Sequence, residues 1–138
     1  MQKTARAILI YENKYVFMKR VKIRNGKKYE YYATIGGHLE ENESFEDACI
    51  REAFEELGVN IKVDELFLDY VNNEIDTHEK YYFASIISGK IGTGQGEEFT
   101  KTDFEKYGSY EIVFVDKKDI ANINLLPGIL KEKMIKEV

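Results

Sequence analysis

Three glutamates near the middle of the chain, Glu52, Glu55 and Glu56, have a spacing that could bind a metal ion. At 3.6 residues per turn they fall within roughly a 100° arc of a helix surface. Like charges three or four residues apart each destabilise a helix by about 0.2–0.5 kcal/mol, and carboxylates in a last turn also oppose the helix dipole. A divalent cation would relieve this repulsion, and Mg²⁺ suits a few carboxylates plus substrate phosphates. We therefore expect a metal site; the alternative is a solvated acidic face.

A helix over residues 45–57 must position these carboxylates. Ser44, followed three residues later by Asp47, predicts its start, and Glu46 and Asp47 suit the positive end of the helix dipole. Gly58 supplies a left-handed stop. Arg51, on the same helix, can offset only part of the acidic charge.

The longer segment from residue 37 to residue 59 places glycine, acidic, basic and aliphatic residues at set intervals: Gly37, Glu43, Arg51, Glu52, Glu55, Glu56, Gly58 and Val59. This pattern resembles the box of the Nudix hydrolase family. Two positions depart from the family pattern. Ala53 replaces a larger aliphatic residue, and Ile35 precedes the paired glycines where many members have proline.

The resemblance implies an α/β fold, the Nudix-type α/β/α sandwich with a mixed sheet between helices. It also implies a Nudix-type pyrophosphohydrolase, which cleaves a nucleoside diphosphate linked to another group by attack of water on phosphorus. Mg²⁺, with Mn²⁺ as a substitute, would neutralise the diphosphate and activate the water. Glu52, Glu55 and Glu56 are then the expected metal ligands and catalytic residues.

Further residues are candidates for the same site. Arg51 is grouped with the catalytic residues, and we expect it to pair with Glu43, which organises the loop before the helix. A backbone carbonyl of the paired glycines, for which we name Gly37, could reach the metal because glycine has no side chain. Many family members carry another acidic ligand or base after the box, and here Glu97 and Glu98 are the candidates for metal binding, with Glu98 also named as catalytic.

Substrate recognition is less marked in the sequence. Arg6, Arg20 and Tyr32 are candidates to contact the substrate. His38 and His78 could act as bases, with solvent-exposed or packing roles as the alternative.

Strands are predicted on both sides of the helix. Residues 5–11 and 15–20 have a hairpin pattern, and the Asn25-Gly26 turn should join residues 19–23 to 28–33. We expect a loop between residue 34 and the helix, strands over 59–63, 66–71, 80–88 and 110–115, and helical pieces over 116–120 and 129–137. The glycine-rich residues 89–100 predict a flexible loop, without the lysine and serine or threonine of a P-loop.

Composition restricts the class of protein. The chain has 138 residues, 43% hydrophobic and 33% charged, which is typical of a single globular domain over residues 1–138. A formal net charge of -5 argues against binding to duplex or other long nucleic acid. The apolar runs are too short for a membrane span or signal peptide, and the single cysteine, Cys49, suits a reducing compartment, so we expect a cytoplasmic protein with no membrane partner.

Two other functions compete with hydrolysis. A sensor module of the same fold could bind nucleotide without cleaving it, and an acidic structural protein would need no ligand. We expect a small-molecule nucleotide as the partner. The sequence leaves open the base, the conjugate, the bond cleaved, the number of metal ions and whether the chain forms a homodimer.

Overall fold

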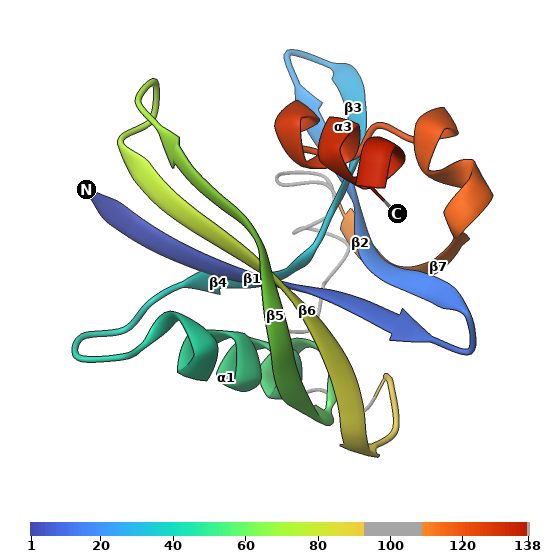
Figure 1. The fold of residues 1–138 in the computed structure, drawn as a ribbon. Coiled ribbons are helices and arrows are strands. Elements are labelled where there is room, and N and C mark those ends of the chain that lie inside the picture. Colours follow the sequence, from blue (N-terminus) through green and yellow to red (C-terminus); the bar gives the residue numbers. More distant parts are fainter. Residues whose placement is uncertain (93–108, 138) are drawn as a thin grey trace. The chain divides into compact units, whose positions relative to one another are not determined.

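The computed structural model describes residues 1–92 and 109–137. The chain divides into two compact units, each drawn in Figure 1. Unit 1 contains residues 1–12 and 34–96, and unit 2 contains residues 13–33 and 97–138. That residues 1–138 form one domain stays a prediction.

Unit 1 is built on a mixed sheet in the order β4-β1-β6-β5. Its strands are β1 (Gln2–Tyr11), β4 (Ile35–His38), β5 (Val59–Asn72) and β6 (Thr77–Gly89). Strand β1 runs parallel to β6 and antiparallel to β4, and β5 runs antiparallel to β6. The residues predicted as two short strands at 59–63 and 66–71 form one strand, because bulges near Asn60, Val63 and Leu66 absorb the breaks in its alternating pattern.

The helix of unit 1, α1 (Phe45–Leu57), has the predicted bounds and caps. The Ser44 side chain accepts a hydrogen bond from the Asp47 N–H, and Gly58 is left-handed with φ 77°. One face of α1 packs on β1, β4 and β5 and is fully buried through Ala48, Cys49, Ala53 and Leu57. Because three of these side chains are small, the helix lies close to the sheet.

The segment before α1 corrects the sequence analysis, which expected a loop between residue 34 and the helix. Residues Ile35–His38 form strand β4, whose Gly36 and Gly37 pair with Arg6 and Ala5 of β1. Two adjacent glycines give no indication of a strand in the sequence, because they are neither β-branched nor part of an alternating apolar pattern. The backbone pairing with β1, which is a long-range contact, decides their conformation.

Unit 2 contains an antiparallel sheet in the order β3-β2-β7. Its strands are β2 (Lys14–Arg24), β3 (Lys27–Ala33) and β7 (Ser109–Asp116). The predicted Asn25-Gly26 turn joins β2 to β3, with φ of 52° and 77° at its two residues. The predicted helical pieces are present as the 3-10 helix η1 (Lys117–Asn122) and helix α3 (Gly128–Glu137), which buries Leu130 and Met134.

Two further expectations concern the loop and the membrane. Most of the glycine-rich stretch 89–100, including Glu97 and Glu98, lies outside the described residues. Within the described ranges 1–92 and 109–137, no helix is both long and apolar enough to cross a membrane.

The single cysteine provides a test of the packing beneath α1. Cys49 is fully buried, and burial raises the pKa of its thiol to about 12. Since the thiolate is the reactive form, we expect a disulfide reagent such as DTNB to modify Cys49 very slowly in the folded protein and at once after unfolding in guanidinium. Fast modification of the folded protein, measured by thionitrobenzoate release, would contradict this packing.

Candidate active site on helix α1 and strand β4

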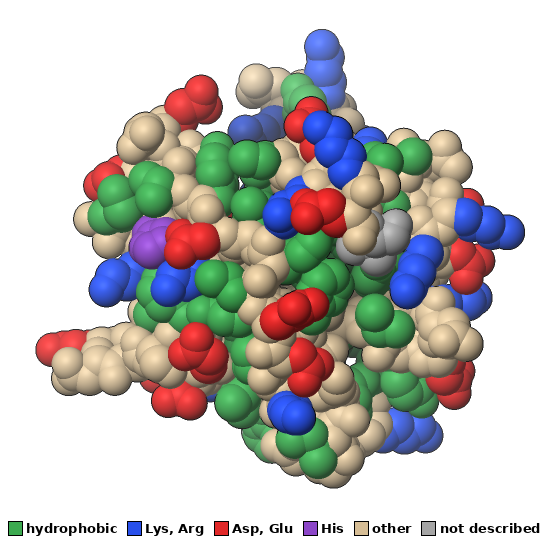
Figure 2. All heavy atoms as spheres, in the orientation of Figure 1, with side chains coloured by type: hydrophobic (Ala, Val, Ile, Leu, Met, Phe, Trp, Pro, Cys, Tyr) green, Lys and Arg blue, Asp and Glu red, His purple; other side chains and the backbone are tan. Residues whose placement is uncertain are grey.

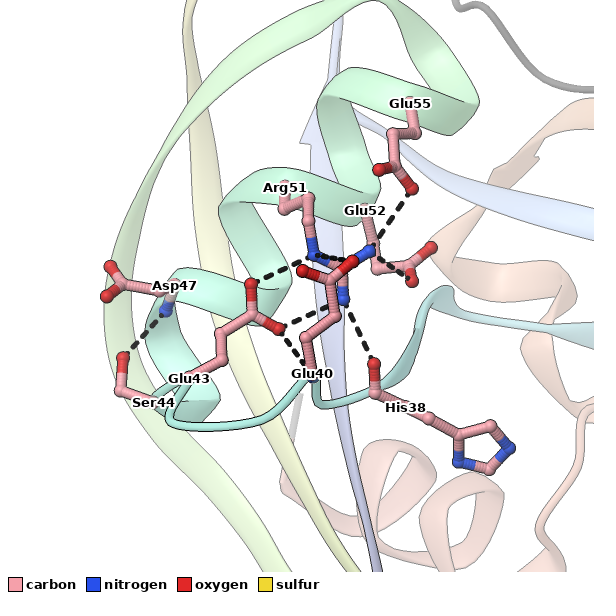
Figure 3. A network of polar contacts seen from close by, with 8 residues as sticks. All are labelled: His38, Glu40, Glu43, Ser44, Asp47, Arg51, Glu52 and Glu55. Carbon is pink, nitrogen blue, oxygen red and sulfur yellow. Dashed lines mark hydrogen bonds and ion pairs between the residues drawn. The ribbon is translucent and has the colours of Figure 1, made fainter.

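Arg51 lies at the centre of a network of carboxylates in unit 1 (Figure 3). Its Nε and Nη2 atoms donate to the two carboxylate oxygens of Glu43 at 2.9 and 3.0 Å, so the predicted pairing of these residues is present. This bidentate geometry joins the loop before the helix to the middle of α1. The Glu40 N–H also donates to Glu43, at 3.0 Å, which fixes the loop conformation.

The remaining donors of Arg51 reach the acidic face and strand β4. Nη1 donates to Glu52 at 3.0 Å and to Glu55 at 3.2 Å, and Nη2 donates to the His38 carbonyl at 3.0 Å. A guanidinium has five N–H groups, and Arg51 makes five hydrogen bonds with them. A single arginine therefore offsets much of the repulsion expected from the sequence.

The ion pair of Arg51 with Glu43 favours the charged form of both residues. The Arg51 hydrogen bonds, and then the Glu40 N–H, lower the pKa of Glu43 below its ordinary value. The hydrogen bond to Glu43 is the main cause that raises the pKa of Arg51. The ion pair therefore contributes stability above the ordinary pKa of a glutamate, and this contribution is lost as the pH falls through the lowered pKa of Glu43.

Strand β4 supports two of the three glutamates. The Gly36 N–H donates to the Glu56 carboxylate at 3.1 Å. At Gly37, a Cβ atom would lie only 2.7 Å from Oε1 of Glu52. The paired glycines thus let the carboxylates of α1 approach the backbone of the strand, which a larger residue would prevent.

The carboxylates of Glu52, Glu55 and Glu56 are oxygen ligands of the kind that a hard divalent cation prefers. Glu52, Glu55 and Glu56 project from two successive turns of α1, and the first two share one nitrogen of Arg51. In the residues that the structure describes, however, no group of three or more acidic, histidine or cysteine side chains is arranged around a common metal position. Glu52 and Glu55 point at Arg51, so binding a metal would require them to exchange that partner for the ion.

The two histidines both have partners in unit 1. The ring of His38 lies 3.1 Å from the Thr4 hydroxyl, measured from Nδ1. The ring of His78 lies 2.6 Å from the Asp69 carboxylate and packs edge-on against Phe45, with ring centroids 5.2 Å apart. Whether either histidine acts as a base stays untested.

The three substrate-binding candidates are distributed over both units. In unit 1, Arg6 donates to the Thr34 carbonyl at 2.8 Å. In unit 2, Arg20 pairs with Tyr31 across β2 and β3, whereas Tyr32 pairs with Lys19. Arg20 and Tyr32 consequently lie on opposite faces of this sheet, and the structure does not bring them together.

Two groups of the network were absent from the sequence analysis. Glu40 lies 3.5 Å from Nε of Arg51, and the His38 carbonyl accepts from Nη2. A backbone carbonyl leaves no trace in a residue pattern, and Glu40 is one of several acids in an acidic loop. Glu97 and Glu98 lie outside the described residues, so their role at this site stays a prediction.

Comparison with known proteins identifies the family. The NUDIX domain model matches residues 1–125. The chain belongs to the NUDIX family. This membership confirms the resemblance predicted from residues 37–59 and agrees with the predicted enzyme class, a Nudix-type pyrophosphohydrolase.

Solved structures of NUDIX proteins show the same fold. A NUDIX hydrolase from Nitrosomonas europaea is similar with a TM-score of 0.70 at 20% identity, over 99% of this chain and 71% of that one. A MutT structure, from work on Aliivibrio salmonicida and Vibrio cholerae, gives 0.66 at 16% identity over 99% and 98%. An ADP-ribose pyrophosphatase from Streptococcus suis gives 0.62 at 14% identity over 97% and 87%. The predicted α/β fold class is confirmed.

Replacing each of the paired glycines of this NUDIX site by alanine separates an effect on folding from an effect on the position of the expected metal ligands. A Cβ at Gly36 would overlap the Ala5 carbonyl, and φ there is 153°, so Gly36→Ala should destabilise the fold by more than about 1 kcal/mol. A Cβ at Gly37 meets only the end of the Glu52 side chain, which can move. We expect Gly37→Ala to melt near the wild-type temperature but to bind Mg²⁺ more weakly.

The measurements are thermal melting without metal and the Mg²⁺ dependence of the melting temperature. Equal destabilisation by the two substitutions, or an unchanged Mg²⁺ response in Gly37→Ala, would contradict the role given to Gly37.

Proposed function

We propose that this NUDIX protein is a Mg²⁺-dependent hydrolase of a nucleoside diphosphate linked to another group, with water attacking phosphorus. The observation that carries the proposal is the position of Glu52, Glu55 and Glu56 on two turns of α1, beside a glycine strand that leaves room for them. The family membership supports the reaction class.

The residues of the site divide into two roles. Glu52, Glu55 and Glu56 would hold Mg²⁺, or Mn²⁺ in its place, together with the Gly37 carbonyl and an acid from Glu97 and Glu98. The bound ion would neutralise the diphosphate and lower the pKa of the attacking water. Glu43 and Arg51 would keep the loop and the helix in register, so that the carboxylates do not have to be ordered when the substrate arrives.

Arg51 also makes the site adjustable. Its Nη1 atom donates to Glu52 and Glu55, whose side chains are 16% and 51% exposed. The bidentate contact with Glu43 does not involve Nη1. Arg51 can therefore release both glutamates to a cation and still anchor the loop.

The substrate itself must be found by experiment. The similar structures are named for different substrates, an ADP-ribose pyrophosphatase and a MutT protein among them, and their low identity shows only the fold. We propose a small-molecule nucleotide, contacted by Arg6, Arg20 or Tyr32. A panel of nucleoside triphosphates, dinucleotides and nucleotide sugars, assayed with Mg²⁺ for released phosphate, diphosphate and nucleoside monophosphate, tests activity and substrate together. Tight binding without turnover would instead indicate a sensor module.

Three organisational predictions accompany this function. The family match covers residues of both units, which supports a single domain over residues 1–138. Cell fractionation would test the expected cytoplasmic location, and light scattering would test whether the chain forms a homodimer.

Loss of a ligand charge should lower turnover. Glu55→Gln and Glu56→Gln keep the size of the side chain but remove its charge, and we expect kcat to fall by at least about a hundredfold, the scale for loss of a main electrostatic stabiliser. Glu132→Gln on α3 makes the same chemical change at an exposed position and serves as the control. Near wild-type kcat in both site variants at saturating Mg²⁺ would refute the metal-site assignment.

Metal binding should also stabilise the fold. Mg²⁺ that binds the native site and not the unfolded chain adds about 2.7 kcal/mol at a hundred times its Kd. We expect the melting temperature to rise by several degrees in millimolar Mg²⁺, and Glu55→Gln to reduce that rise because the site then has one ligand fewer. The comparison uses NaCl at matched ionic strength to remove screening. An equal rise in wild type and variant would show that the ion binds elsewhere.

A further inference from the structure

The outer part of the hairpin of β2 and β3 in unit 2 carries a surface beyond Arg20, the substrate-contact candidate that pairs with Tyr31 on the same face. Its register pairs Lys22 with Tyr29 and Arg24 with Lys27, and Tyr31 follows Tyr29 two residues later. Opposite and alternate residues share one face of a sheet. These five residues therefore form a single surface, here called the basic–aromatic face.

The charge on this face is unbalanced. The acid of the hairpin, Glu30, pairs with Val21 and so lies on the other face, where it forms an ion pair with Lys19 at 3.3 Å. Within the described ranges, Lys22, Arg24 and Lys27 form no ion pair with a carboxylate. Lysine and arginine side chains, with an acidic side chain beside them, are seen over this hairpin at the top of Figure 2. The face is thus a local positive surface on a chain whose net charge is -5.

The tyrosines lie among these cations; Tyr29 is exposed and Tyr31 is half-buried. Tyr29 is 51% exposed, and the Lys22 ammonium lies 5.7 Å from the centroid of the Tyr31 ring. A half-exposed aromatic ring on a basic sheet is the arrangement on which unpaired bases stack while cations contact the backbone phosphates.

We propose that the basic–aromatic face binds a short stretch of single-stranded nucleic acid. Phosphates would contact Lys22, Arg24 and Lys27, and bases would stack on Tyr29 and Tyr31. Successive same-face residues along β2 are about 6.8 Å apart, so an extended strand can present consecutive phosphates to them. Duplex is disfavoured because its bases are already stacked and because the negative chain would repel its many other phosphates. The proposal uses unit 2 alone and does not depend on hydrolysis.

Fluorescence anisotropy tests this binding with short labelled oligonucleotides of RNA and of DNA. Their 5′ ends carry a hydroxyl and the buffer contains EDTA, so the proposed hydrolysis cannot contribute. We expect both single strands to bind, with an affinity that falls with salt. Lys22→Gln, Arg24→Gln and Lys27→Gln should each reduce the salt slope by about 0.7, because each variant neutralises one phosphate fewer. Tyr29→Ala should weaken binding at least about fivefold, because the bases then have one ring fewer on which to stack.

The hairpin offers a matched control. Lys28 pairs with Ile23, so it belongs to the opposite face and is exposed, and Lys28→Gln should change neither affinity nor salt slope. Amide NMR shifts of the wild type on titration with the same oligonucleotide should concentrate in β2 and β3. Equal weakening by Lys28→Gln and Lys22→Gln would overturn the proposal. So would tighter binding of duplex, or binding of inorganic polyphosphate that matches the oligonucleotide, since a base-free polyanion uses no tyrosine.

Discussion

The ion pair of Arg51 with Glu43 is the interaction on which the site depends. It is bidentate, its two side chains are 22% and 13% exposed, and it ties the loop before α1 to the middle of the helix. The other donors of the same guanidinium hold Glu52, Glu55 and the end of β4. A lysine could not replace it, because a single ammonium lacks the planar fork that reaches several acceptors at fixed angles. The acidic face of the helix therefore has a cationic partner within the protein itself.

The second constraint is the close approach of α1 to the sheet. Small buried side chains at Ala48, Cys49 and Ala53 face the strands, and glycines at Gly36 and Gly37 remove side chains from the strand next to the acidic face. As a result the carboxylates project from a capped helix that packs against a paired strand, which is a more rigid support than a loop. Ala53, which departs from the family pattern, fits this arrangement because it is fully buried against the sheet.

Charge in this protein is better described locally than by its sum. The net charge of -5 combines an acidic helix, whose carboxylates surround one arginine, with a hairpin that carries cations on both faces and its acid on one of them. Each region could contact phosphate groups by a different route, the first through a metal ion and the second directly. The net charge alone would have hidden the second.

The sequence by itself determined the family, the bounds and caps of α1, the placing of Glu52, Glu55 and Glu56 on this helix and the Asn25-Gly26 turn. Each depends on residues close together in the chain, so spacing and turn chemistry carry the information. Only the tertiary structure decided that Gly36 and Gly37 form a strand, that the His38 carbonyl accepts from Arg51, and that Arg20 and Tyr32 lie on opposite faces. These features arise from strand register and from backbone groups brought together across the chain, and neither leaves a local pattern in the residues.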